Sequence, residues 1–151
     1  MKVILDTNIL INALNDKNSM AWQILELATK GEVEFFASPK IINEYNLVID
    51  REVANEAEKQ ELTAFIARVH VAPVTRQVQA VKFDPEDDKF LDIALSVGAE
   101  FIISADAHLV ELGEYEGVKI LKPEEFWYQW QNESDESGEG EWKKIFGGLF
   151  K

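Results

Sequence analysis

The sequence predicts an α/β fold of three layers, in which helices cover both faces of a central parallel sheet of about four to five strands. Short apolar runs typical of buried strands alternate with helical patterns along the first 131 residues. This alternation favours a parallel sheet, because parallel neighbours need a long crossover that is usually a helix. With 151 residues, of which 46% are hydrophobic, the chain is long enough for one buried core.

The first half of the chain alternates strand and helix twice. Residues 3–5 form a short apolar run, which is typical of a strand buried on both faces. Residues 19–30 place apolar side chains at helical spacing and end at Gly31. Residues 33–36 are the second strand, and Ser38, followed by a proline, predicts the cap of a helix that continues to residue 49.

The second half predicts the same alternation with shorter elements. Asp84 followed by Pro85 repeats the cap-and-proline start of a helix, which ends at Gly98. The other expected elements are an acidic helix over 52–68, short strands at 70–72 and 78–81, a buried strand at 101–103, a short helix at 107–112, a strand at 118–121 and a closing helix at 123–130.

Composition divides the chain into three segments. Residues 1–131 are expected to form the folded domain, and residues 132–141 are polar, acidic and glycine-containing, which predicts a flexible linker. Residues 142–151 form a short amphipathic segment. This segment either docks on a partner or another subunit, or covers apolar surface of its own domain.

Composition also excludes several functional classes. The chain has no cysteine and two histidines, so disulfide scaffolds and thiolate zinc sites are excluded. A net charge of −13 excludes a diffuse basic surface for nucleic acid. No apolar run approaches the roughly 18 residues of a membrane span, and no signal peptide is expected. We therefore expect a cytoplasmic protein with no membrane partner.

Four acids are expected near the carboxyl end of the sheet, where ligands bind in such folds. Asp6 directly follows the first strand, and Asp106 follows the strand at 101–103. Asp87 shares a helix side with apolar residues, and Glu44 lies near the apolar stripe of its helix. Each acid alone is also compatible with an ordinary helix cap, turn or surface position. Together they predict a site for Mg²⁺ or Mn²⁺, because clustered carboxylates need a cation.

Four motifs resemble those of PIN-domain proteins in order and spacing over about residues 1–125. They are Leu5-Asp-Thr-Asn8, Ser38-Pro-Lys-Ile-Ile-Asn-Glu44, Asp84 to Ala99, and Phe101-Ile-Ile-Ser-Ala-Asp-Ala-His-Leu109. The branch that they resemble most is that of the VapC-like toxins of bacterial type II toxin–antitoxin pairs.

The resemblance implies a PIN-like fold and an endoribonuclease that cleaves RNA phosphodiester bonds with water activated by Mg²⁺ or Mn²⁺. It assigns the catalytic and metal-binding acids to Asp6, Glu44, Asp87 and Asp106. We prefer Asp87 to Asp88 as the third acid, because the apolar and small residues that follow Asp87 match the family pattern.

The resemblance also implies supporting roles for other residues. Orienting or outer-shell roles are expected for Thr7, Asn8, Asp88, Asp92 and Ser104. The sequence has Ala105 where the family often has glycine. Contacts with RNA phosphates are expected from Arg51, Lys82 and Lys89, although exposed bases are common without such a role. The implied partners are an RNA substrate, an antitoxin and a second copy of the chain in a homodimer.

Two other functional classes share part of this pattern. A haloacid-dehalogenase-like phosphatase also begins with a strand and an aspartate, but Asn8 stands where its second carboxylate is required. A catalytically silent PIN-like module that only binds partners is disfavoured, because all four acids are present. Glycine-rich nucleotide loops and a serine-hydrolase elbow are absent from the sequence.

Overall fold

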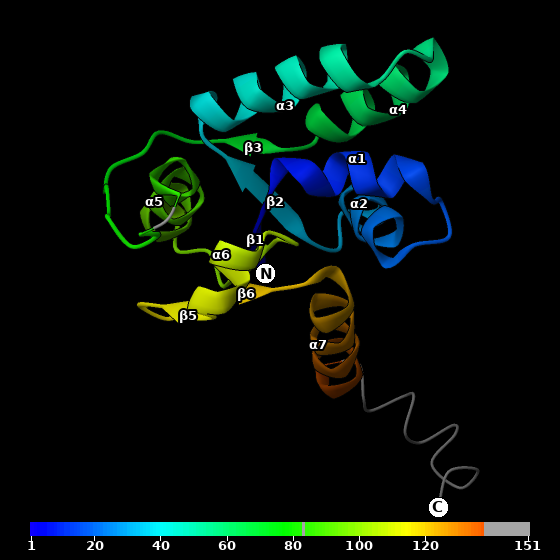
Figure 1. The fold of residues 1–151 in the computed structure, drawn as a ribbon. Helices are drawn as coiled ribbons and strands as arrows, with labels where there is room; N and C mark the ends of the chain where they lie inside the picture. The colour runs from blue at the N-terminus through cyan, green and yellow to red at the C-terminus, as the bar shows by residue number, and fades with distance from the viewer. Residues whose placement is uncertain (83, 138–151) are drawn as a thin grey trace, which may run out of the picture.

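The computed structural model describes residues 1–82 and 84–137, which form a six-stranded sheet of order β3-β2-β1-β4-β6-β5 (Figure 1). All neighbouring strands are parallel except β5, which is antiparallel to β6. The strands are β1 (Lys2–Leu5), β2 (Glu34–Ala37), β3 (His70–Val71), β4 (Phe101–Ile103), β5 (Glu114–Tyr115) and β6 (Val118–Leu121). The predicted three-layer α/β/α fold is confirmed.

The sheet exceeds the expected four to five strands because residues 114–121 form a short hairpin. Glu116 and Gly117 connect its two strands with φ values of 47° and 88°. Positive φ at both central residues is the geometry of a tight turn whose twist matches that of the strands. β5 was not expected, because two residues carry no periodic pattern.

Helices cover both faces of the sheet (Figure 1). The strand register places Val3, Phe35 and Phe101 on one face, where Phe35 packs edge-on against Phe65 and Phe101 packs likewise against Phe126. The two helices that supply these partners are α4 (Glu56–Ile66) and α7 (Pro123–Ser137). The opposite face is covered by α5 (Asp88–Val97), which packs against β1, β2, β4 and β6.

The predicted caps position the other helices. The Ser38 hydroxyl accepts a hydrogen bond from the Ile41 amide at 3.2 Å, as predicted. Ser19, which the sequence analysis did not identify as a cap, accepts from the Trp22 amide in the same way. The helix begun by Asp84 and Pro85 starts differently, as a 3₁₀ turn, η1 (Pro85–Asp87), which passes into α5. The remaining helices are α1 (Thr7–Asn15), α2 (Met20–Lys30), α3 (Pro39–Glu52) and α6 (Ala107–Leu112).

The expected strand at 78–81 was wrong, because residues 75–81 pair with side chains of α5 instead of another strand. We call this segment the strap. Ser96 accepts hydrogen bonds from the amides of Thr75 and Arg76, at 2.9 and 3.2 Å. Asp92 accepts one from Val78 at 2.8 Å, and Asp88 accepts two, from Ala80 and Val81, at 3.0 and 2.9 Å. One face of α5 thereby replaces the neighbouring strand.

The C-terminal boundary stays a prediction. Helix α7 continues through Ser137, so it includes the first part of the segment 132–141 that we expected to be a linker. The amphipathic segment 142–151 lies outside the described residues. Among the residues that the structure describes, no helix combines the length and the apolar character needed to cross a bilayer.

Candidate metal centre

Asp6 lies at the centre of the carboxyl edge of the sheet. Its backbone amide donates to the carbonyl of Ile103 at 2.9 Å, so the ends of β1 and β4 are held side by side. The Ser104 hydroxyl donates to Asp6 Oδ2 at 2.7 Å, and the Asn8 amide donates to Oδ1 at 3.4 Å. Asp6 therefore caps α1 and is also oriented by the residue that follows β4, with only 4% of its surface exposed.

Asp106 reaches the same edge from β4. Its amide donates to the Ser104 hydroxyl oxygen at 3.0 Å, so one serine contacts both aspartates. Asp106 Oδ1 caps α6 by accepting the amides of His108 and Leu109, at 2.9 and 3.2 Å. Asp106 can be both a helix cap and a candidate metal ligand, because the cap uses only Oδ1 and leaves Oδ2 for a metal ion.

A third acid that the sequence analysis missed joins Asp106 and Asp87. Asp84, Asp87 and Asp106 each offer a carboxylate oxygen, and these oxygens lie within 4.8 Å of one another. The sequence predicts only a helix cap at Asp84, but its side chain makes no capping hydrogen bond. The missing signal was the Asp-x-x-Asp spacing across a proline-started turn, which places both side chains on the same side of η1.

The close carboxylates of this cluster raise the pKa of Asp87. Asp87 Oδ2 is buried and has no hydrogen-bond partner among the described residues. Burial, followed by the charges of Asp106, Asp84 and Asp6, raises the pKa of Asp87 to about 7, and Lys89 opposes this. Such a group favours either a proton or a cation beside it.

Asp6 is coupled to the same cluster. Burial raises the pKa of Asp6 above its ordinary value, although the hydrogen bonds from Ser104 and Asn8 act in the opposite direction. The charges of Asp106 and Glu44 raise the Asp6 pKa further. The four acids selected from the sequence are therefore near enough to interact electrostatically.

Glu44 is held by two side chains on the edge of this cluster. The Thr7 hydroxyl donates to Glu44 Oε2, and Lys89 Nζ donates to Glu44 Oε1 at 2.7 Å. Lys89 is only 9% exposed, and its side chain is a counter-ion of Glu44. The expected contact of Lys89 with RNA phosphates therefore stays a prediction.

Tyr45 is a second residue that the sequence analysis did not single out. Its buried hydroxyl donates to the carbonyl of Leu5, next to Asp6. Burial, with the charges of Asp6 and Glu44, raises the Tyr45 pKa above its ordinary value. Tyr45 therefore stays a neutral donor that fixes the end of β1. In the sequence, Tyr45 has the spacing of an ordinary core residue of its helix, so its role at the end of β1 could not be predicted.

Asp88 and Asp92 hold the strap. The sequence predicts outer-shell roles for both at the centre, and in the structure their carboxylates accept hydrogen bonds from backbone amides of the strap. Asp88 is 8% exposed, and its Oδ1 is shared by two amides. The adjacent carboxylates Asp87 and Asp88 thus have different surroundings, the acid cluster for Asp87 and the strap for Asp88.

An open cleft of about 460 Å³ lies beside Asp106. Asn8 and Arg51 both line it, and the Arg51 side chain is 70% exposed and paired with its neighbour Glu52 at 3.1 Å. Lys82 is also exposed, at the end of the strap. Two of the three expected RNA contacts are therefore available at the surface.

Three comparisons relate this fold and centre to known proteins. The PIN domain family matches residues 2–108. The uncharacterized protein MJ1680 of Methanocaldococcus jannaschii is 27% identical over 117 residues, covering 74% of this chain and 75% of that protein.

A chain from the crystal structure of VapBC2 from Rickettsia felis, solved bound to a DNA fragment from their promoter, is similar in fold. The TM-score is 0.53 and the identity 16%, covering 80% of this chain and 97% of that chain. The family match spans most of the chain and includes Asp6, Glu44, Asp87 and Asp106. This chain belongs to the PIN-domain family.

Proposed function

We propose that this chain is a metal-dependent endoribonuclease that hydrolyses RNA phosphodiester bonds and is the toxin of a toxin–antitoxin pair. One observation carries the proposal. Asp84, Asp87 and Asp106 bring carboxylate oxygens within 4.8 Å of one another, and one buried oxygen of Asp87 has no partner among the described residues. Membership of a family of generally hydrolytic nucleases supports the same chemistry.

The donor set fits Mg²⁺ or Mn²⁺. Both ions prefer carboxylate and water oxygens, and the chain offers no thiolate. Asp6, Asp87 and Asp106 would hold the ion, with Asp84 as an added ligand and Glu44 completing the site. When bound, such an ion supplies positive charge to the phosphate oxygens and lowers the pKa of a water molecule.

The surrounding residues orient these ligands. Ser104 donates to Asp6 and accepts from the Asp106 amide, which fixes the relative position of both acids. Thr7 and Lys89 hold the two oxygens of Glu44. Glu44 lies beside Asp6, so its carboxylate would hold the attacking water or complete the ligand set. Substitution of an orienting residue should lower metal affinity without removing a ligand.

Substrate contacts and partners follow from charge. Arg51 and Lys82 would contact RNA phosphates, and the −13 net charge makes metal essential for holding a polyanion. The same acidity favours a basic protein partner, such as an antitoxin. The fold similarity to a chain of VapBC2 supports an antitoxin partner. A homodimer and a cytoplasmic location are part of the proposal.

The test is RNA cleavage with a matched pair of isosteric variants. Mixed single-stranded and structured RNAs are incubated with the chain in Mn²⁺, Mg²⁺ or chelator. Asp87→Asn should abolish the metal-dependent cleavage. Asp50→Asn, an exposed acid on the far part of α3, should leave it unchanged.

Two results would contradict the proposal. Cleavage that survives Asp87→Asn and Asp106→Asn would place the activity elsewhere or in a contaminant. Absence of cleavage with every RNA and metal, while Mn²⁺ still raises the melting temperature, would favour the catalytically silent, partner-binding alternative.

A further inference from the structure

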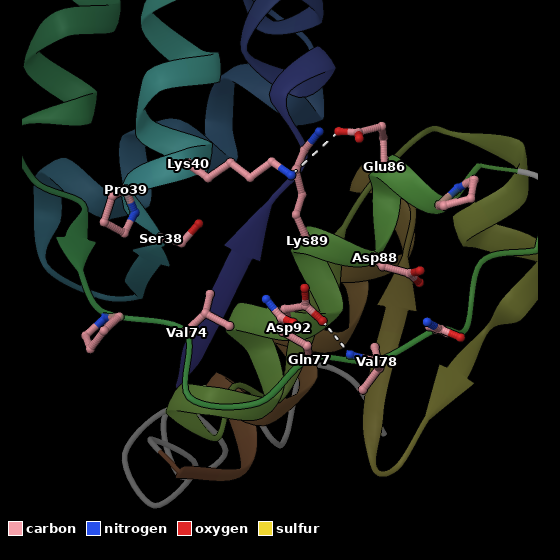
Figure 2. A pocket seen from close by; sticks show the side chains of 13 residues that line it. Ser38, Pro39, Lys40, Val74, Gln77, Val78, Glu86, Asp88, Lys89 and Asp92 are labelled. Atoms are coloured by element: carbon pink, nitrogen blue, oxygen red, sulfur yellow. Dashed lines mark hydrogen bonds and ion pairs between the residues drawn. The ribbon is translucent and has the colours of Figure 1, made fainter.

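A second cavity lies beside the candidate metal centre and is not used by the mechanism above. It has a volume of about 860 Å³ and is open to solvent between the start of α3, the strap with the residues before it, and α5 (Figure 2). Lys89 joins the two sites, because it lines the cavity and also donates to Glu44 at 2.7 Å. Small-molecule sites have volumes of about 300–1,000 Å³, so this cavity has room for one nucleotide.

The cavity walls offer both apolar side chains and polar groups. Pro39, Pro73 and Val74 supply the apolar part, from α3 and from the segment that leads to the strap. Gln77 and Gln79 supply exposed amides, each with donors and an acceptor. Proteins recognise unpaired RNA bases by hydrogen bonds to the base edges and by stacking of the base face, mostly on aromatic or arginine side chains. In this cavity the groups for the edge are present, and proline and valine side chains supply the contact with the face.

The charged side chains that line the cavity favour a base over a phosphate group. Asp88 and Asp92 line it from α5, and Glu86 lies at its edge, paired with Lys40 at 3.7 Å. A phosphate would be repelled by these carboxylates, whereas the amino group of a neutral base would be a suitable donor. Asp92 uses Oδ1 for the strap, and its Oδ2 makes no hydrogen bond within the described part of the chain.

The cavity is also built in advance of any ligand. The strap is held on α5 by amides bonded to Asp88, Asp92 and Ser96 over its whole length. By contrast, the Lys40–Glu86 pair at the rim is weak, because its side chains are 66% and 76% exposed. A ligand can therefore displace the rim pair while the walls stay in place.

We propose that this cavity binds the base of the nucleotide adjoining the scissile phosphate, that Gln77 and Gln79 hydrogen-bond the base edge, and that Asp92 favours a base with an amino group over uracil. This inference rests on the proposed nuclease function. The phosphate of that nucleotide would lie on the acid side of Lys89, and its base on the cavity side.

The cleavage test uses single-stranded RNAs that differ only at the nucleotide beside the cut. The full chain should prefer adenine, cytosine or guanine to uracil at this position. The double variant Gln77→Ala/Gln79→Ala should lose about tenfold in kcat/KM on all of these RNAs. The isosteric Asp92→Asn, whose side-chain oxygen still accepts from Val78, should lose most of the preference. The matched control is Gln60→Ala, an exposed glutamine on α4, and all three variants should keep the melting-temperature rise caused by Mn²⁺.

A binding test separates this inference from the nuclease proposal. Adenosine, cytidine, guanosine and uridine are added to the full chain, and backbone amide NMR signals are followed. The first three should shift the signals of Gln77, Gln79 and Asp92 more than uridine does. Val74→Trp, which fills the cavity, should remove these shifts.

The outcomes distinguish the two proposals. Cleavage with an unchanged preference in Asp92→Asn, and nucleoside shifts confined to other surfaces, would overturn the base site and leave the nuclease intact. Selective shifts in the cavity of a protein that cleaves no RNA would refute the nuclease and, with it, the position of the base beside a scissile bond.

Discussion

Asp87 occupies a position where a carboxylate is unfavourable without a positive partner. Its pKa in the folded chain, about 7, is well above its ordinary value of 3.8. Between these two values the folded state binds more protons than the unfolded state at this residue, so the Asp87 contribution to stability falls as pH rises from about 4 to about 7. Above pH 7 the full unfavourable contribution remains.

This gives a prediction for the metal-free protein. Asp87→Asn should raise the melting temperature relative to wild type at pH 8, and the difference should shrink as the pH is lowered to about 4. Mn²⁺ should raise the melting temperature of wild type at pH 8, but much less that of Asp87→Asn. Thermal unfolding at each pH, with chelator and with Mn²⁺, measures both effects. Equal responses of the two proteins to Mn²⁺ would contradict the assignment of Asp87.

The Glu44–Lys89 pair gives a prediction about stability. The Lys89 and Glu44 side chains are 10% and 35% exposed, so Lys89→Met would leave a partly buried carboxylate near Asp6 without its counter-ion. We expect a loss of about 1–3 kcal/mol in the free energy of unfolding, between the values for exposed and buried pairs. Urea denaturation measures it.

A double-mutant cycle separates the pair from packing. Adding Glu44→Gln to Lys89→Met should recover part of the loss, because the isolated charge is then removed. If the two substitutions are additive, Lys89 acts through its alkyl chain and not through Glu44.

At the scale of elements, side chains on one face of α5 accept the hydrogen bonds that the strap would otherwise make with a neighbouring strand. Asp88, Asp92 and Ser96 are spaced by four residues, so α5 presents them in a row along one side. The strap leads to Asp84 through residues 82 and 83, and the same helix begins beside Asp87. The strap therefore ties the cavity wall to the segment that carries two acids of the cluster.

Asp92→Ala tests this arrangement. The variant leaves the Val78 amide without its 2.8 Å acceptor, and we expect a loss of about 1–3 kcal/mol, as for other hydrogen bonds to charged groups. Hydrogen exchange at Val78 and Ala80 should accelerate more than exchange in β1. Asp50→Ala, the matched control on α3, should not change exchange in the strap. Unchanged protection of Val78 in Asp92→Ala would mean that the side chain does not hold the strap.

The elements that could be predicted from sequence are those with local signals. Ser38 followed by proline, Gly31, and the apolar runs of β1 and β4 each depend on nearby residues, and the structure has them as expected. The strap could not be predicted, because its partners are side chains of a helix further along the chain. The sequence pattern of residues 78–81 is that of a strand, whether the amides bond to another strand or to side chains of a helix.

The same reasoning explains what was missed in the candidate centre. The acids at the ends of β1 and β4 follow from topology, because parallel strands end at one edge. The positions of the Asp84 and Lys89 side chains depend on how η1 passes into α5, whereas the sequence predicts one continuous helix there. A continuous helix from residue 85 would place both side chains differently.

At the scale of the whole molecule, the −13 charge limits how the proposed RNA substrate can be held. Arg51 and Lys82 are the two expected phosphate contacts that remain exposed. We therefore predict a shallow salt dependence, with log(kcat/KM) falling against log[salt] with a slope of about −1 to −2, since each phosphate contact on single strands contributes about −0.7.

Arg51→Ala should lower kcat/KM and reduce the size of this slope by about 0.7. The measurement is a salt titration of RNA cleavage at saturating Mg²⁺, with Arg68→Ala, an exposed arginine beyond the end of α4, as the control. An Arg51→Ala slope equal to that of wild type would exclude Arg51 from the RNA path.

Both edges of the sheet are short. The outer strands, β3 and β5, each contain two residues, and β5 already uses one side in its hairpin with β6. So short an edge offers an incoming chain few free backbone groups, which protects a sheet against edge-to-edge aggregation. The same property disfavours the binding of a partner by strand addition. The proposed antitoxin is therefore expected to recognise helix faces or to enter the clefts beside the acids. Its sequence should carry helices or a basic extended segment instead of a donor strand.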